Sequence, residues 1–222
     1  MKSHEYIQQY YRPEIDGLRA IAVVLIILSH FQDTGFSSGG VNIFFVISGY
    51  LISHILIKKD LNLKTFFITR FLKLYPQLFI IGTLTFLFFI VFGDIEQWTS
   101  IVRSYFFTIY GILNIYLISI NDIYGFGEDI NPFLPFWAFC VIFQFYITFP
   151  FLLKFIFYIK NRINLKDEFI TTSLFVLSAI LFIIYFFFRD KSIFNFYSPL
   201  SRYWQFLLGS FMYFIIFYKK KK

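Results

Sequence analysis

Two polar residues lie in the first long apolar stretch, where a polar side chain is costly and needs a reason. Arg19 and His30 are eleven residues apart, so on an α-helix they face one side, about 16 Å apart along the axis. Arginine can hold an anion and histidine can move a proton, so the pair could line one cavity. On spacing alone a structural role is favoured, with Arg19 snorkelling to one interface and His30 at the opposite headgroup level.

A second basic pair follows the second apolar stretch. Arg70 and Lys73 are three residues apart and share one face of a helix. The segment Thr65–Tyr75 is typical of an interfacial amphipathic helix, and Pro76 is suited to the first turn of the next helix. The pair could bind the phosphates of a cytoplasmic donor. Attraction to anionic lipid also explains the two basic residues, and this explanation is favoured on the pattern alone.

The remaining polar positions favour structural roles. Ser48 and Gly49 are expected to allow close helix packing. Arg202, at the start of the last apolar stretch, is expected to snorkel, with Gln205 on its face of the helix. The single cysteine, Cys140, is expected in the core. One cysteine and three histidines give no reason to expect a metal site.

The composition sets the class of protein. Of 222 residues, 58% are hydrophobic, 25% aromatic and only 15% charged, and the mean hydropathy is +0.68. Too few polar residues are present to cover a soluble fold of this size, which excludes a soluble enzyme, a disordered chain and a nucleic-acid-binding domain. The net charge of +7 therefore has to be interpreted by position along a membrane protein.

The apolar stretches predict an all-α, polytopic transmembrane bundle that forms a single domain over residues 1–222. None of them alternates with period two, which disfavours a transmembrane barrel. Seven stretches approach the length of a membrane span: Leu18–Phe31, Val41–Ile57, Leu78–Phe92, Tyr105–Ile120, Phe133–Tyr158, Phe169–Phe188 and Tyr203–Tyr218.

The positions of Lys and Arg select six spans over seven. If Tyr105–Ile120 does not span, 16 basic residues lie on the cytoplasmic side of the membrane and four on the outer side. If it spans, the numbers are 11 and nine. The prediction is therefore about six spanning helices with both termini cytoplasmic. Tyr105–Ile120 is expected to be re-entrant or interfacial, in keeping with its interior Gly111 and Asn114.

Four segments in order resemble the membrane-bound acyltransferase family 3, the O-acyltransferases of bacterial surface polysaccharides. They are YRPEIDGLRAIA (Tyr11–Ala22), the histidine His30, GVNIFFVISGYLI (Gly40–Ile52) and FITRFLKLYP (Phe67–Pro76). The spacing of Arg19 and His30 matches the signature of the family. Its basic pair matches Arg70 and Lys73, with lysine replacing the second arginine.

The resemblance implies transfer of an acyl group, expected to be acetyl, from cytoplasmic acyl-CoA to a hydroxyl of an outward-facing glycan, in the bacterial inner membrane. His30 would be the general base or carry a transient acyl adduct, and Arg19 would steady the donor. Arg70 and Lys73 would bind its phosphates. No metal is implied, and the expected partners are membrane lipid and the glycan acceptor.

Later motifs depart from the family pattern. The block Leu134–Pro150 retains Trp137, Gln144, Phe145 and Tyr146, but Pro135, Ala138 and Ile142 replace a histidine, a serine and a glutamate. Gln205 stands where the family has an acid, and the family usually has about ten spans. Two alternatives stay open: an inactive or split homologue that needs a second protein to complete the bundle, and a small transporter subunit.

Overall fold

The structure is a computed structural model that describes residues 13–31, 37–58, 61–120, 131–188 and 192–219. Every regular element in these ranges is helical, so the prediction of an all-α fold is confirmed. The α-helices are α2 (Pro13–Phe31), α3 (Ser37–Lys58), α4 (Leu63–Phe92), α5 (Trp98–Ile109), α6 (Leu113–Ser119), α7 (Trp137–Arg162), α8 (Glu168–Phe187), α9 (Ser192–Tyr197) and α10 (Pro199–Lys219). Two short 3₁₀ turns, Ile95–Gln97 and Leu134–Phe136, precede α5 and α7.

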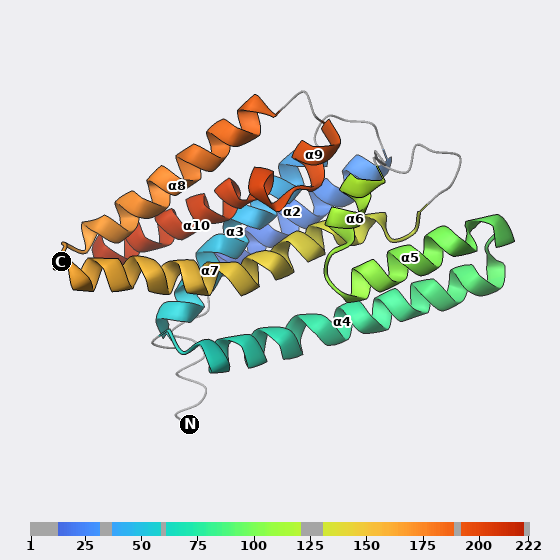
Figure 1. The fold of residues 1–222 in the computed structure, drawn as a ribbon, viewed down its shortest axis with the longest axis horizontal. Helices are drawn as coiled ribbons and strands as arrows, with labels where there is room; N and C mark the ends of the chain where they lie inside the picture. The colour runs from blue at the N-terminus through green and yellow to red at the C-terminus, as the bar shows by residue number, and fades with distance from the viewer. Residues whose placement is uncertain (1–12, 32–36, 59–60, 121–130, 189–191, 220–222) are drawn as a thin grey trace.

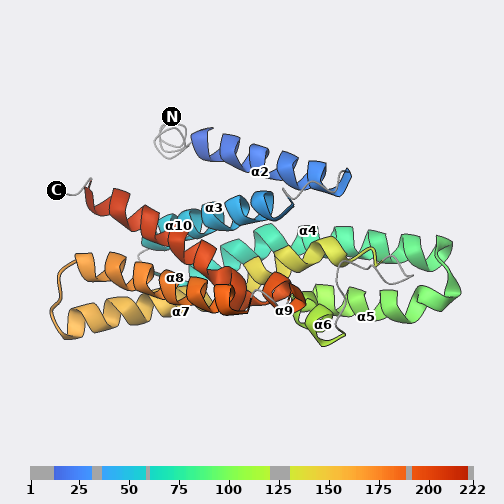
Figure 2. The same cartoon turned by 90° about the horizontal axis from the view of Figure 1, so that it is seen from above.

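The long helices form an elongated bundle around α3, α7 and α10 (Figure 1). α10 packs along both α3 and α8, α4 pairs with α5, and α2 packs along α3 at one side of the bundle (Figure 2). Stacked rings join the three central helices: Phe206 of α10 lies 4.6 Å from Phe45 of α3 and 4.2 Å from Phe145 of α7, between ring centroids. Ring contacts of this kind help to specify which faces of the three helices meet.

Two glycines bring α3 and α10 into direct backbone contact. A Cβ atom on Gly49 would collide with the carbonyl oxygen of Phe206, and one on Gly209 would collide with that of Val46. The hydroxyl of Ser210 donates a hydrogen bond to the Gly49 carbonyl oxygen across this crossing, at 3.2 Å. The expectation of close helix packing at Gly49 is confirmed, because small residues let membrane helices approach closely.

Four helices of the described chain are long and apolar enough to cross a membrane: Gly39–Lys58, Leu63–Phe92, Leu134–Arg162 and Glu168–Phe187. The two other predicted spans are also helical, as α2 and α10. α2 carries Glu14, Asp16 and Arg19 near its start, and α10 contains Arg202 and Gln205. These polar residues reduce the apolar character of both helices, and the count of six spans stays a prediction.

The predicted boundary at Pro76 is wrong. Residues Leu63–Phe92 form one helix of 30 residues with Pro76 inside it, about 45 Å long. Proline removes one backbone hydrogen bond from a helix, whereas a break would expose several more polar backbone groups to an apolar environment. A continuous helix is therefore favoured. The interfacial helix and the following span that the sequence predicted are one helix, and Arg70 lies two turns from its start.

The segment Tyr105–Ile120, which was expected to be re-entrant or interfacial, is divided into two helices. α5 ends at Ile109, Gly111 adopts a φ of +71°, and the short helix α6 begins at Leu113. The side-chain amide of Gln144 in α7 donates to the Gly111 carbonyl oxygen at 2.9 Å. A positive φ suits glycine, and Gln144 satisfies a carbonyl that the helix break leaves open. The placement of this segment relative to the membrane stays a prediction.

Candidate functional site

Arg19 points from α2 toward α3, where its Cζ atom lies 5.7 Å from the centre of the Phe44 ring. The two helices run in opposite directions and pack closely at Gly40, whose missing side chain leaves room for the backbone of Ala22 and for Ile26. The close approach holds the guanidinium of Arg19 against an aromatic face and leaves it half-buried.

Arg70 reaches the same region from α4. Its Cζ atom lies 5.8 Å from the centre of the Tyr146 ring of α7. The guanidinium groups of Arg70 and Arg19 are close enough for their charges to act on each other, and both act on the hydroxyl of Tyr146. Residues from α2, α4 and α7, which are far apart in sequence, thus meet at one place.

This two-arginine site has the features of an anion-binding site. The Nε atoms of Arg19 and Arg70 are buried and have no hydrogen-bond partner, and in the described part of the chain neither guanidinium forms an ion pair. Two half-buried cations without a carboxylate are costly unless an anion completes them, and guanidinium binds phosphate and carboxylate oxygens strongly. The arrangement therefore favours an anionic ligand.

Lys73 lies one turn beyond Arg70 on α4 and is exposed. The structure therefore joins Arg70 to Arg19 and leaves Lys73 beside the site rather than in it. Lysine is a compact, mobile cation on a long stem, so Lys73 is suited to a second charge on the same ligand.

α2 is helical throughout the interval between Arg19 and His30. The eleven-residue spacing thus has the helical geometry that the sequence predicted, about 16 Å along the axis. The side chain of His30 lies outside the described residues, and its role stays a prediction.

A buried polar cluster at α3 and α10 contradicts the prediction that Arg202 snorkels. Arg202 is only 4% exposed, and its guanidinium lies 5.0 Å from the Phe196 ring centre and 5.6 Å from that of Trp137. Its Nε donates to the Phe196 carbonyl oxygen at 2.9 Å, and its Nη1 donates to Asn42 Oδ1 at 3.2 Å. Tertiary partners replace the hydration that snorkelling would have supplied.

Gln205 completes this cluster by donating from Nε2 to Asn42 Oδ1 at 2.8 Å. Gln205 is 1% exposed, and its Oε1 atom is buried without a hydrogen-bond partner. Asn42 belongs to the GVNIFF motif and Arg202 to the RYWQ motif, so each residue lay in a motif that the sequence analysis had identified. What the sequence could not show was that residues 160 positions apart meet.

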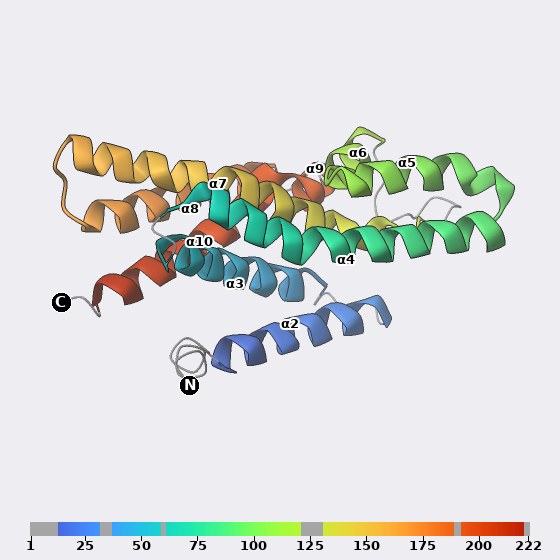
Figure 3. The ribbon, with the colours of Figure 1, turned by 90° about the horizontal axis from the view of Figure 1, so that it is seen from below.

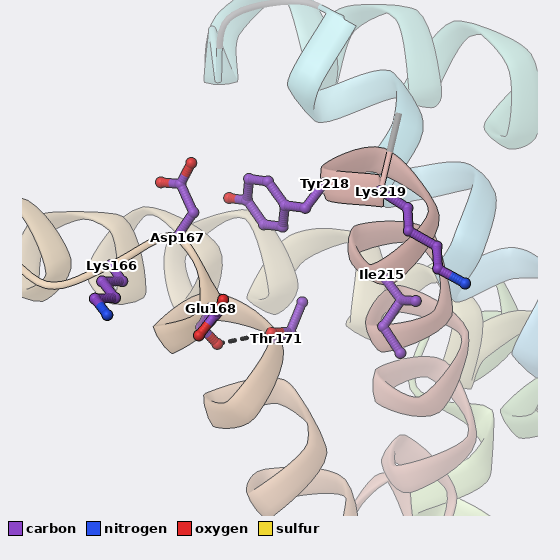
Figure 4. Close-up of a pocket in the computed structure, with 7 residues that line it drawn as sticks. All are labelled: Lys166, Asp167, Glu168, Thr171, Ile215, Tyr218 and Lys219. Atoms are coloured by element: carbon purple, nitrogen blue, oxygen red, sulfur yellow. Dashed lines mark hydrogen bonds between the residues drawn. The ribbon is translucent and has the colours of Figure 1, made fainter. Parts of the chain in front are cut away.

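A separate cavity of about 580 Å³ lies at the end of the bundle where α7 turns into α8 (Figure 4). Four charged residues of both signs line it, namely Lys166, Asp167, Glu168 and Lys219. Thr171, Ile215 and Tyr218 complete the lining. Asp167 also forms a salt bridge with Lys160. None of the residues predicted to act on a substrate lines this cavity, which distinguishes it from the two-arginine site.

Comparison with known proteins matches residues 12–222 to the family described as "Acyltransferase domain". The chain is 32% identical over 155 residues to the peptidoglycan O-acetyltransferase OatA of Listeria monocytogenes, a match that covers 66% of this chain and 25% of that protein. It is 34% identical over 143 residues to the O-acetyltransferase OatA of Staphylococcus aureus, covering 61% of this chain and 24% of that protein.

A putative O-acetyltransferase of Staphylococcus aureus is 43% identical over 94 residues, covering 37% of this chain and 16% of that protein. The chain thus spans about a quarter or less of the length of these relatives. No solved structure matches it. Because the family match covers nearly the whole sequence, the chain belongs to the membrane-bound acyltransferase family 3.

Proposed function

We propose that this protein transfers an acetyl group from acetyl-CoA to a hydroxyl of a cell-surface glycan. The observation that supports it best is the pair of half-buried guanidinium groups, Arg19 and Arg70, whose buried Nε atoms have no hydrogen-bond partner. Coenzyme A carries several phosphate charges, which such a pair can bind. Matched relatives are named O-acetyltransferases, one of them a peptidoglycan O-acetyltransferase.

In the proposed reaction His30 removes the proton from the acceptor hydroxyl. The hydroxyl oxygen then forms a bond to the acetyl carbonyl carbon, the bond from that carbon to sulfur breaks, and the thiolate leaves and takes up a proton. Arg19 and Arg70 hold the phosphates of the donor, and Lys73 at the edge of the site binds a further charge. Positioning two substrates in this way is itself a large part of catalysis.

The proposed orientation places both termini in the cytoplasm of a bacterial cell, with the chain in the cytoplasmic membrane. α2 begins, and α10 ends, at the same end of the bundle, where α3 also ends and α4 begins (Figures 2 and 3). Lys58, Lys64 and Lys219 lie at these helix ends. A concentration of Lys and Arg at one end supports a cytoplasmic location for it.

Measurement of acetyl transfer by the purified protein in lipid nanodiscs tests the proposal. The donor is acetyl-CoA, the acceptor is a soluble peptidoglycan fragment, and the readouts are free thiol and acetylated glycan. We expect His30→Ala to abolish transfer and Arg70→Met to raise the KM for acetyl-CoA about tenfold or more, because a hydrogen bond to a charged group is worth about 1.5–3 kcal/mol. Unchanged transfer by His30→Ala would contradict the proposal.

A second candidate function is that of a homologue whose bundle is completed by another protein. The outward side of α2 supports it, since the apolar residues Leu18, Ile21, Val24 and Leu28 are each at least half exposed. The same residues would also suit contact with lipid. Native mass spectrometry of the protein extracted in lipid distinguishes these cases: a second polypeptide held with α2 supports completion by a partner, and lipid alone supports the chain acting by itself.

A further inference from the structure

The cavity at the end of the bundle lies where three long helices begin or end. The apolar span of α7 ends at Arg162, α8 begins at Glu168, and α10 ends at Lys219 (Figure 1). The cavity of about 580 Å³ opens between the start of α8 and the end of α10 (Figure 4). Helices that cross a membrane place their ends among the lipid headgroups. The cavity is therefore at the depth of a headgroup rather than of an acyl chain.

The charges of the cavity are arranged by sign. Asp167 and Glu168 lie together at the start of α8, whereas Lys166 and Lys219 extend away from each other on opposite sides (Figure 4). Asp167 also forms a salt bridge with Lys160, so three cations and two carboxylates lie in or beside the cavity. A wholly anionic headgroup would face both carboxylates, and a wholly cationic one would face the lysines. A headgroup with both an ammonium and a phosphate matches the two signs.

The inner wall of the cavity offers hydrogen-bond acceptors to an ammonium. Tyr218 is half-buried, and its phenol points from α10 toward Asp167 (Figure 4). Carboxylate and phenol oxygens accept hydrogen bonds, and a primary ammonium has three hydrogens to donate. A trimethylated ammonium has none, so the cavity should distinguish these two groups. The lysines on either side can bind the phosphate as point charges.

Apolar side chains continue from the cavity along α8 and α10. Thr171 and Ile215 line the cavity, and one helical turn further into the bundle the rings of Phe175 and Phe211 meet, 5.2 Å apart between centroids. Ile215, Phe175 and Met212 are all exposed. A charged cavity with exposed apolar surface directly next to it matches the two parts of a lipid, the headgroup and the acyl chains.

We propose that this cavity binds an aminophospholipid, a membrane lipid whose headgroup carries a phosphate and a primary ammonium. Asp167 and Glu168 hold the ammonium, and the phosphate lies against Lys219 or Lys166. The acyl chains follow the exposed apolar residues of α8 and α10. A lipid held in this way joins the start of α8 to the end of α10. The site shares no residue with the two-arginine site, so it does not depend on the function proposed above.

Lipid titration followed by native mass spectrometry of the protein in detergent micelles tests the proposal. The probes are phosphatidylethanolamine, phosphatidylcholine and phosphatidylglycerol with the same acyl chains. We expect phosphatidylethanolamine to bind about tenfold more tightly than either of the others, because it alone presents a phosphate together with an ammonium that can donate hydrogen bonds. Equal affinity for the three lipids would overturn the proposal.

Two variants separate the roles of the two signs of charge. Glu168→Gln keeps the shape of the side chain and removes its charge, so we expect it to weaken phosphatidylethanolamine binding about tenfold without weakening phosphatidylglycerol binding. Lys219→Met should weaken the binding of both lipids about fivefold, because both carry a phosphate. The matched controls are Glu14→Gln and Lys154→Met, at exposed positions outside the cavity, and both should bind like the wild type. Unchanged affinity for phosphatidylethanolamine in Glu168→Gln or in Lys219→Met would overturn the proposal.

A water-soluble headgroup separates a lipid site from a site for a free phosphate compound. Glycerophosphoethanolamine has the same phosphate and ammonium but no acyl chains. We expect it to displace phosphatidylethanolamine only at about a hundredfold higher concentration or more, because the acyl chains bury apolar surface along α8 and α10. Displacement at equal concentration would overturn the assignment to a lipid. Because Glu168 and Lys219 are exposed, both variants should keep the wild-type Tm in phosphatidylcholine nanodiscs, so that a loss of lipid binding reports on the cavity and not on folding.

Discussion

At the residue scale, the half-buried amide of Asn42 is the common acceptor that joins α3 to α10. Its Oδ1 accepts from Arg202 Nη1 and from Gln205 Nε2. A leucine in its place would leave two buried donors without an acceptor, one of them charged. Each unsatisfied donor would cost about 1–3 kcal/mol of folding free energy. Loss of the Asn42 acceptor is therefore expected to destabilise the protein.

We therefore expect Asn42→Leu to lower the free energy of unfolding by about 2–4 kcal/mol, measured by denaturant unfolding in mixed micelles. The matched control is Asn161→Leu, at an exposed position of α7, which should change stability by about 0.5 kcal/mol or less. Equal stabilities for the two variants would show that the Asn42 bonds contribute nothing.

Three arginines, Arg19, Arg70 and Arg202, show what the sequence could and could not predict at this scale. That Arg19 and Arg70 were candidates for a functional role was predictable from local sequence, although the local pattern alone favoured structural roles for both. Their meeting was not, because it depends on how α2 and α4 dock on α3 and α7. The interpretation of Arg202 as a snorkelling residue was wrong for the same reason, since its acceptor Asn42 lies 160 positions earlier.

At the element scale, the crossing of α3 and α10 depends on two side chains that are absent. We expect Gly209→Ala to cost about 1–3 kcal/mol, because the new Cβ meets the rigid backbone of Val46 and the helices must separate. Gly17→Ala is the control, since nothing lies within 4 Å of its Cβ position in α2; it should be neutral or stabilising by about 0.5–1 kcal/mol. Thermal unfolding of both variants is the measurement, and a destabilisation shared by the two would contradict close packing as the cause.

The helices themselves were predictable because apolar length is a strong signal in a membrane protein. The glycine and asparagine in Tyr105–Ile120 set this segment apart from the spans, and the structure does break it at Gly111. Pro76 was misleading: local propensity favours a helix start there, but the apolar surroundings favour one continuous α4. The packing contact at Gly209 leaves no mark in local sequence that separates it from the open position of Gly17.

At the scale of the whole molecule, the placement of basic residues predicts sidedness. We expect single cysteines at Lys64 and Asn164, in a Cys140→Ser background, to react with an impermeant maleimide only from the cytoplasmic side. A cysteine at Glu96, beyond the far end of α4, should react only from the outside. The experiment uses inside-out and right-side-out vesicles. Labelling of positions 64 and 96 from the same side would contradict the predicted topology.

The family match covers residues 12–222, but the relatives are about four or more times longer than the matched segments. At this scale the sequence predicted the family from motifs in its first eighty residues, and those motifs supply Arg19, Phe44 and Arg70 of the two-arginine site. Only Tyr146 comes from the later, more divergent block. The part of the chain that departs most from the family pattern therefore still contributes to the site.

Equilibrium binding of coenzyme A to the protein in nanodiscs tests the two-arginine site most directly. The variants are Arg19→Met and Arg70→Met, with Lys154→Met as the control, because Lys154 is an exposed cation on the side predicted to be cytoplasmic. We expect each arginine variant to weaken binding about tenfold or more and the control to bind like the wild type. Equal affinity of all four proteins for coenzyme A would contradict the assignment of this site to the donor.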